Sequence, residues 1–74
     1  MKNEQTRRLE DAAELALLEL LIRQEVAIDV LFALTESIHA GASYRDLCEA
    51  TAKAGSLDPD YVEALFFAKY QSLK

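Results

Sequence analysis

Residues 9–22 of the chain read LEDAAELALLELLI and consist almost entirely of strong helix formers. Neither glycine nor proline occurs between Met1 and Ala40, and the apolar pattern continues past this stretch as far as Ile38. A turn inside it would normally recruit Gly, Asn or Pro. The sequence therefore predicts one long helix over about residues 6–40, preceded by a polar, frayed start at residues 1–5.

The length of this helix raises a question about what covers it. A continuous helix over residues 6–40 would span about 50 Å, whereas a compact chain of this size has a diameter of about 30 Å. Either the helix breaks near Arg23-Gln24-Glu25, the most polar stretch of its interior, or it stays whole and another chain covers the overhang. All three residues have good helix propensity, which favours the continuous helix.

The second half of the chain carries clearer boundary signals. Gly41 suits the left-handed residue that stops the first helix. Ser43 begins a second helix, over about residues 43–54, and Gly55 ends it. Asp58 is a good N-cap and Pro59 fits the first helical position, so a third helix follows over about residues 58–73. No segment has the pattern of a strand, and we expect a single all-α domain over residues 1–74, most simply a dimeric bundle.

The apolar positions of the long helix divide into two seams. A small-residue seam, suited to close packing inside the domain, contains Leu9, Ala13, Ala16, Leu20, Ala27, Leu34 and Ile38. A second seam has the three-four alternation of a short coiled coil, and Phe67 points away from the inner face of the last helix. We therefore expect a partner or dimer interface at Leu18, Leu21, Glu25, Ile28, Phe32 and Phe67. The alternative is one broad core face that leaves a few leucines exposed, as is normal for protein surfaces.

Length, charge and cysteine content limit the classes of protein to which this chain could belong. A core of 74 residues rarely supplies more than about 3–5 kcal/mol, which favours an oligomer. The single cysteine, Cys48, excludes an intrachain disulfide and fits the reducing cytoplasm. With 8 basic and 13 acidic residues, the net charge of −5 suits a basic protein partner better than nucleic acid. A polar N-terminus and interior charges argue against a signal peptide or a membrane span.

Catalytic chemistry has little support in the sequence. His39 is the only histidine and stands at a helix end without an assigned partner. The carboxylate pairs Glu10/Glu14 and Glu25/Asp29 have helical spacing but lack the Glu-x-x-His companion of a metal-binding bundle. No Gly-rich phosphate loop, Ser-His-Asp set or zinc pattern is present in the sequence. We predict a protein that is not an enzyme, with no catalytic residues, cofactor or metal.

Two functions remain open at this point. The first is a small acidic interaction module, of the regulator, inhibitor or co-chaperone type, that self-associates or binds another protein through the long helix. Two Glu25 carboxylates facing each other in a symmetric dimer would repel, which favours an additional, basic partner. The second is a DNA-binding regulator, because residues 43–73 have the layout of a helix-turn-helix unit. The start of its reading helix, however, carries the acids Asp58, Asp60 and Glu63 where base-reading side chains are expected.

Overall fold

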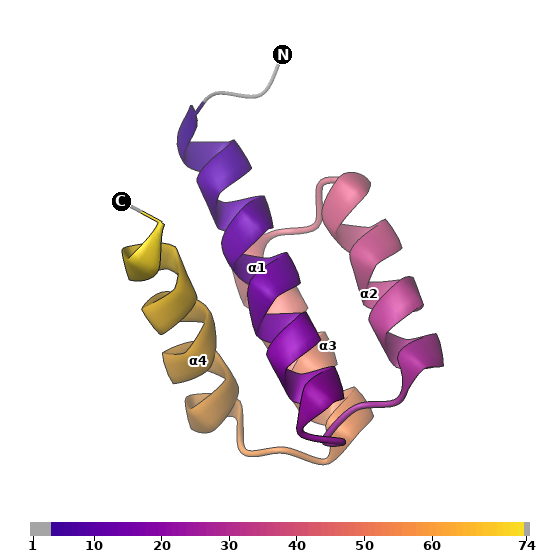
Figure 1. Ribbon diagram of the computed structural model, residues 1–74. Coiled ribbons are helices and arrows are strands. Elements are labelled where there is room, and N and C mark those ends of the chain that lie inside the picture. Colours follow the sequence, from indigo (N-terminus) through magenta and orange to yellow (C-terminus); the bar gives the residue numbers. More distant parts are fainter. Residues whose placement is uncertain (1–3, 74) are drawn as a thin grey trace.

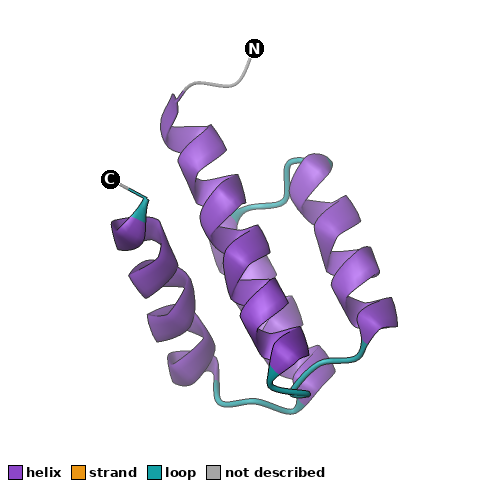
Figure 2. Ribbon diagram, in the orientation of Figure 1, coloured by secondary structure: helices purple, strands orange, loops and turns teal. Residues whose placement is uncertain are grey.

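Four helices make up the part of the chain that the computed structural model describes, residues 4–73 (Figure 1). They are α1 (Glu4–Ile22), α2 (Ile28–His39), α3 (Tyr44–Gly55) and α4 (Pro59–Ser72), and Figure 2 shows only loops between them. The prediction of an all-α fold is confirmed. Glu4 and Gln5, within the stretch expected to fray, form the first turn of α1, and residues 1–3 lie outside the described part.

The helices are arranged around α1. In Figure 1, α2 and α4 flank α1 on opposite sides and α3 lies behind it. Within the described residues α1 contacts all three other helices, whereas α2 and α4 do not contact each other. The radius of gyration is 11.2 Å, close to the value of about 11 Å for a compact chain of this length. One side of α1, between α2 and α4, is therefore left uncovered by the other described helices.

The long helix predicted for residues 6–40 is wrong: the chain turns between Ile22 and Ile28 and returns along α1 as α2. Gln24 takes the left-handed conformation, with φ of 61°. The Gln24 amide donates to the Leu21 carbonyl (2.9 Å) and the Glu25 amide to the Leu20 carbonyl (2.8 Å). These two bonds form a Schellman motif, which satisfies the last carbonyls of α1.

Tertiary burial explains why the turn prevails over local propensity. A left-handed residue other than glycine costs about 1–2 kcal/mol. The folded-back α2 places Leu34 and Ile38 in the core with Leu17 of α1, and full burial of one aliphatic side chain contributes about 1.5–3 kcal/mol. A continuous helix would leave much of that surface in water and would exceed the longest molecular dimension of 32 Å.

The other two turns confirm the predicted helix starts. The Ser43 hydroxyl accepts from the Asp46 amide (3.1 Å), and the Asp58 carboxylate accepts from the Asp60 amide (3.0 Å), with Pro59 at the first helical position. Gly41, with φ of 90°, stops α2 as expected. At the end of α3 the left-handed residue is Ser56 (φ 52°).

Gly55, predicted to stop α3, serves a different purpose. A Cβ at this position would lie 3.0 Å from the main-chain oxygen of Glu25 and 3.0 Å from the Leu57 side chain. The glycine therefore lets the end of α3 approach the α1–α2 turn closely.

The core forms along the inner side of α1. Ala12, Ala13 and Ala16 are fully buried, and such small side chains allow the other helices to pack closely. Of the predicted small-residue seam, most members are buried, Leu9 is half-buried and Ala27 is exposed. The largest fully buried side chains are Phe66, Leu17, Leu20, Ile38, Val62 and Thr51. The Thr51 hydroxyl donates to the Leu47 carbonyl (2.6 Å), so this buried polar group is satisfied.

Candidate protein-interaction groove

The uncovered side of α1 carries a row of exposed apolar side chains. Leu15, Leu18 and Ile22 are 42%, 47% and 75% exposed. Their spacing of three and four residues places them on one stripe of the helix. Single exposed apolar residues are ordinary, but a contiguous row between two flanking helices marks a surface that other molecules can cover.

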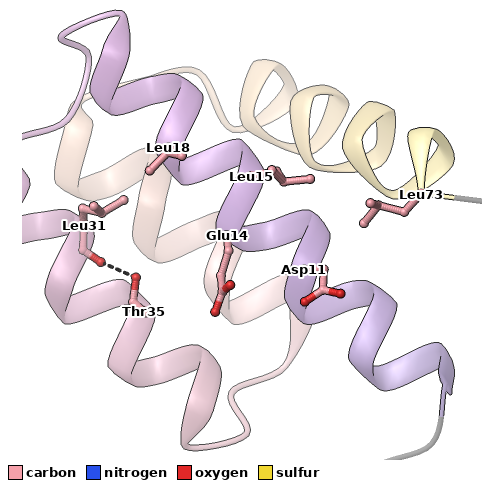
Figure 3. Close-up of a pocket in the computed structure, with 7 residues that line it drawn as sticks. All are labelled: Asp11, Glu14, Leu15, Leu18, Leu31, Thr35 and Leu73. Atoms are coloured by element: carbon pink, nitrogen blue, oxygen red, sulfur yellow. Dashed lines mark hydrogen bonds between the residues drawn. The ribbon is translucent and has the colours of Figure 1, made fainter.

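Leu15 and Leu18 form the floor of a groove that α2 and α4 complete. We call this site the α1 groove; it has a volume of about 500 Å³ and is lined by Asp11, Glu14, Leu15, Leu18, Leu31, Thr35 and Leu73. Figure 3 shows these residues coming from α1, from α2 and from the end of α4. The Thr35 hydroxyl donates to the Leu31 carbonyl (2.8 Å). That bond turns the polar group of Thr35 back to its own helix, so the α2 wall is mainly apolar.

Carboxylates give the groove its charge. Asp11 and Glu14 stand on α1 beside the two leucines (Figure 3). Glu14 Oε1 lies 3.3 Å from His39 Nε2, across the gap between α1 and α2. The groove therefore combines an apolar floor with acidic side chains at its edge.

The six residues predicted for the interface do not all line one hollow. Leu18 lies in the α1 groove, and Ile28 and Phe32 are exposed on α2 (53% and 61%). Leu21 and Glu25 instead line a second hollow of about 470 Å³, beside the α1–α2 turn and the end of α3.

Phe67 is 55% exposed, but it is on a different side of the molecule. Two residues further on, Lys69 pairs with Glu19 on α1, and Leu73 lines the α1 groove. At about 100° per residue, Phe67 and Lys69 point to nearly opposite sides of α4. Phe67 therefore points away from the α1 groove.

The α1–α2 turn is held by a polar network that the sequence did not reveal. Arg23 Nη1 donates to the Tyr61 hydroxyl (2.8 Å), and that hydroxyl donates to Glu25 Oε1 (3.3 Å). The hydrogen bond with Tyr61 raises the pKa of Arg23. Glu19 extends the network, since it accepts from Lys69 and lies 3.1 Å from Arg23. The hydrogen bond from Lys69 lowers the pKa of Glu19.

Sequence reasoning missed Leu15, Leu31 and Leu73 as groove residues. For Leu15 a signal existed, because it precedes Leu18 by three residues on the same stripe. For Leu31 and Leu73 no local signal was available, because they reach the groove only when α2 folds back and α4 packs along α1.

Two nucleophilic or titratable groups outside the groove, Cys48 and Tyr44, are engaged in packing. Cys48 is buried, and burial raises its pKa to about 11. Burial likewise raises the pKa of Tyr44 to about 12, and its ring packs edge-on against Phe66 with centroids 5.8 Å apart. Within residues 4–73, no three His, Cys, Asp or Glu side chains gather in a way that could hold a metal ion.

The helix-turn-helix layout exists in the structure as α3, a short turn and α4. Asp58, Asp60 and Glu63 are exposed at the start of α4. Arg45, one of the few basic residues near this surface, lies 3.7 Å from Glu49. The surface that would face DNA phosphates is therefore predominantly acidic at that helix start.

Comparisons of the chain with known protein families, with curated proteins and with solved structures find no match. Among the described helices, none combines the length and the apolar content that crossing a membrane requires.

Proposed function

We propose that this protein is a small non-enzymatic interaction module that binds a basic amphipathic helix of another protein in the α1 groove. The observation that carries the proposal is the placement of exposed Leu15 and Leu18 between α2 and α4, with Leu31 and Leu73 as walls and two carboxylates at the edge. Burying this apolar surface against a partner would remove it from water, which is favourable in free energy.

The dimensions support a helical partner. From Asp11 to Leu18 the groove follows two turns of α1, about 11 Å. A helix laid into such a groove presents apolar side chains at positions i, i+3, i+4 and i+7, and these repeat over the same distance. These apolar side chains of the partner helix would pack against Leu15 and Leu18.

The negative charge of the groove favours a different protein as the partner over a second copy of the chain whose α1 groove faces the first. The chain has a net charge of −5, and Asp11 and Glu14 stand at the groove itself. Two copies facing each other here would place four carboxylates close together, whereas Lys or Arg beside the apolar face of a different helix would pair with them. The resulting binding should weaken as salt is added.

A designed peptide tests the proposal directly. The probe is a synthetic helical peptide with leucines along one face and lysines on the other, and its control has the same composition in scrambled order. We expect the ordered peptide to bind. Leu18→Ser should weaken its binding about tenfold or more, because the serine removes one buried aliphatic contact.

Phe67→Ser provides the matched control, since Phe67 is similarly exposed but lies on the far side of α4. It should leave the affinity unchanged, and circular dichroism checks that both variants stay folded. Equal loss of binding in the two variants, or equal binding of ordered and scrambled peptides, would refute the proposal.

The DNA-binding alternative rests on the order of α3 and α4 alone. It requires salt-dependent affinity for duplex DNA that falls when Arg45 and Lys53 are replaced by glutamate. We expect no binding to a fluorescent duplex even at low salt, because acids occupy the start of α4.

A further inference from the structure

The α1–α2 turn has a local conformation that its own residues do not favour. Gln24 is left-handed at φ 61°, and Ala27, the residue before α2, makes no side-chain hydrogen bond to the first amides of that helix. A non-glycine residue in this conformation and an uncapped helix start are both unfavourable. The turn therefore carries two local penalties.

Both penalties would disappear if α1 and α2 joined into one helix. Arg23, Gln24, Glu25 and Ala27 all have good helix propensity, and Val26 is tolerated. In a continuous helix the amides at the start of α2 would bond to carbonyls one turn earlier. The local sequence thus prefers the straight form, and tertiary contacts must add to the two main-chain hydrogen bonds of the Schellman motif to hold the turn.

Those tertiary contacts are few and specific to the turn. They are the buried side chain of Val26, the hydrogen bonds that link Arg23 and Glu25 through Tyr61, and the close approach of Gly55 to the turn. Away from the turn, α1 contacts the helices α2, α3 and α4 themselves. A second copy of the chain can supply the same partners to α1, because its α2, α3 and α4 are identical.

We propose that the α1–α2 turn is a hinge at which the chain opens into one continuous helix and exchanges α1 with a second copy. The product is a domain-swapped dimer, in which each α1 packs on the three other helices of the partner copy. Short turns under strain favour such exchange. Each α1 groove is then rebuilt from two chains, with Leu15 and Leu18 from one copy and Leu31 and Leu73 from the other. The exchange is independent of what the groove binds.

Substitutions at Gln24 test the hinge directly. Glycine relieves the left-handed conformation and weakens a straight helix, whereas alanine retains the strain and favours the helix. Each protein is unfolded, refolded at high concentration and examined by size exclusion with light scattering. We expect Gln24→Ala to form more dimer than Gln24→Gly, by about thirtyfold per hinge and therefore about a thousandfold in the dimer dissociation constant.

Ser56 supplies the matched control. Among residues 4–73 it is the other left-handed residue that is not glycine, with φ of 52°. Pro59, however, comes three residues later and cannot lie inside a continuous helix. Ser56→Ala and Ser56→Gly should therefore give equal dimer fractions. A dimer that responds equally to changes at Gln24 and Ser56 would contradict the hinge.

An intrachain distance separates the swap from simple docking of two copies. Glu14 and His39 lie in contact in the closed chain, at 3.3 Å, but would be about 38 Å apart in a continuous helix. Spin labels at cysteines replacing both residues, in a Cys48→Ala background diluted with unlabelled protein, report this distance. A long distance in the isolated dimer supports the exchange.

A dimer whose labels stay close overturns the proposal in favour of surface docking. A protein that refolds only as monomer, both as wild type and as Gln24→Ala, also overturns it. If Gln24→Ala fails to fold, the wild-type and Gln24→Gly proteins still give the comparison.

Discussion

The α1–α2 turn and the α3–α4 turn both reverse the chain through a left-handed residue that is not glycine, Gln24 in one and Ser56 in the other. In each, the two amides at and after that residue bond back to the preceding helix. The turns differ in the residues that begin the next helix. Asp58 and Pro59 cap and start α4 shortly after Ser56, whereas Ala27 before α2 offers no side-chain cap.

The difference shows which forces form each turn. The α3–α4 turn is encoded locally, because a capping aspartate and a proline stop one helix and begin the next. The α1–α2 turn is held from outside, by Tyr61 on α4, by the burial of Val26 and by the close approach of Gly55. The locally encoded α3–α4 turn thus starts the helix α4, and α4 carries Tyr61, which secures the α1–α2 turn.

The largest effect should come from Gly55, where the two turns meet. We expect Gly55→Val to destabilise the fold by about 2–3 kcal/mol, because its side chain would crowd the Glu25 carbonyl and Leu57. Urea unfolding measures this. Ala54→Val is the control on the same turn of α3, and since Ala54 is exposed it should cost only about 0.5 kcal/mol through helix propensity. Equal losses would mean that the contact between the turns is unimportant.

Moving the local signals of one turn into the other should give the next largest effect. Ala27→Asp with Ile28→Pro reproduces the Asp58-Pro59 pair at the start of α2. Ala27 already has φ −79° and ψ 158°, which suits both an N-cap and a residue before proline. We expect a gain of about 1.5–2 kcal/mol from the new cap and the restricted unfolded chain.

Thermal unfolding measures that gain as a rise of the midpoint by about 4–8 °C for each kcal/mol. The double variant should also abolish the swapped dimer, because proline cannot continue the helix. A loss of stability would show instead that the half-exposed Ile28 contributes packing that the turn needs.

This contrast also explains how much the sequence could predict. The starts of α3 and α4 were predicted because Ser43, Asp58 and Pro59 act on their immediate neighbours. The turn at Gln24 was placed only as the less favoured alternative, because its residues are helix formers and the Tyr61 hydroxyl that secures it comes from α4.

The same limit applies to the candidate site. The apolar spacing placed Leu18 on an outer surface, and Phe67 was expected to point away from the inner face; both are exposed. In the structure, however, Leu21 and Glu25 line a second hollow, and Leu31 and Leu73 join Leu18 in the α1 groove. The partners of a groove residue depend on the topology, and the topology depended on a turn that the sequence offered only as the less favoured alternative.

Removing the Tyr61 hydroxyl should have an intermediate effect. We expect Tyr61→Phe to destabilise the fold by about 1 kcal/mol, because Arg23 and Glu25 lose their shared partner. One carboxylate oxygen of Glu25 is already buried without a hydrogen bond, so the loss leaves this side chain poorly satisfied. Tyr70→Phe is the control, as the Tyr70 ring lies under the Arg8 guanidinium and contributes by its face. Hydrogen exchange at the α1–α2 turn should accelerate in Tyr61→Phe only.

The smallest effect should come from Glu19, which joins the turn to α4 through Arg23 and Lys69. Its pKa is lowered from 4.5, mainly by the hydrogen bond from Lys69. A carboxyl group with a lowered pKa in the folded state contributes stability above its ordinary value, and this contribution is lost as the pH falls through the lowered one. The wild-type protein should therefore lose stability below pH 4.5 more steeply than Glu19→Gln. Lys69→Met should reduce the steepness in the same way, because it removes the main cause of the shift. If Glu19→Gln left the slope unchanged while Lys69→Met reduced it, the pH dependence would belong to another carboxylate, and the polar connection from α4 to the turn would rest on Tyr61 alone.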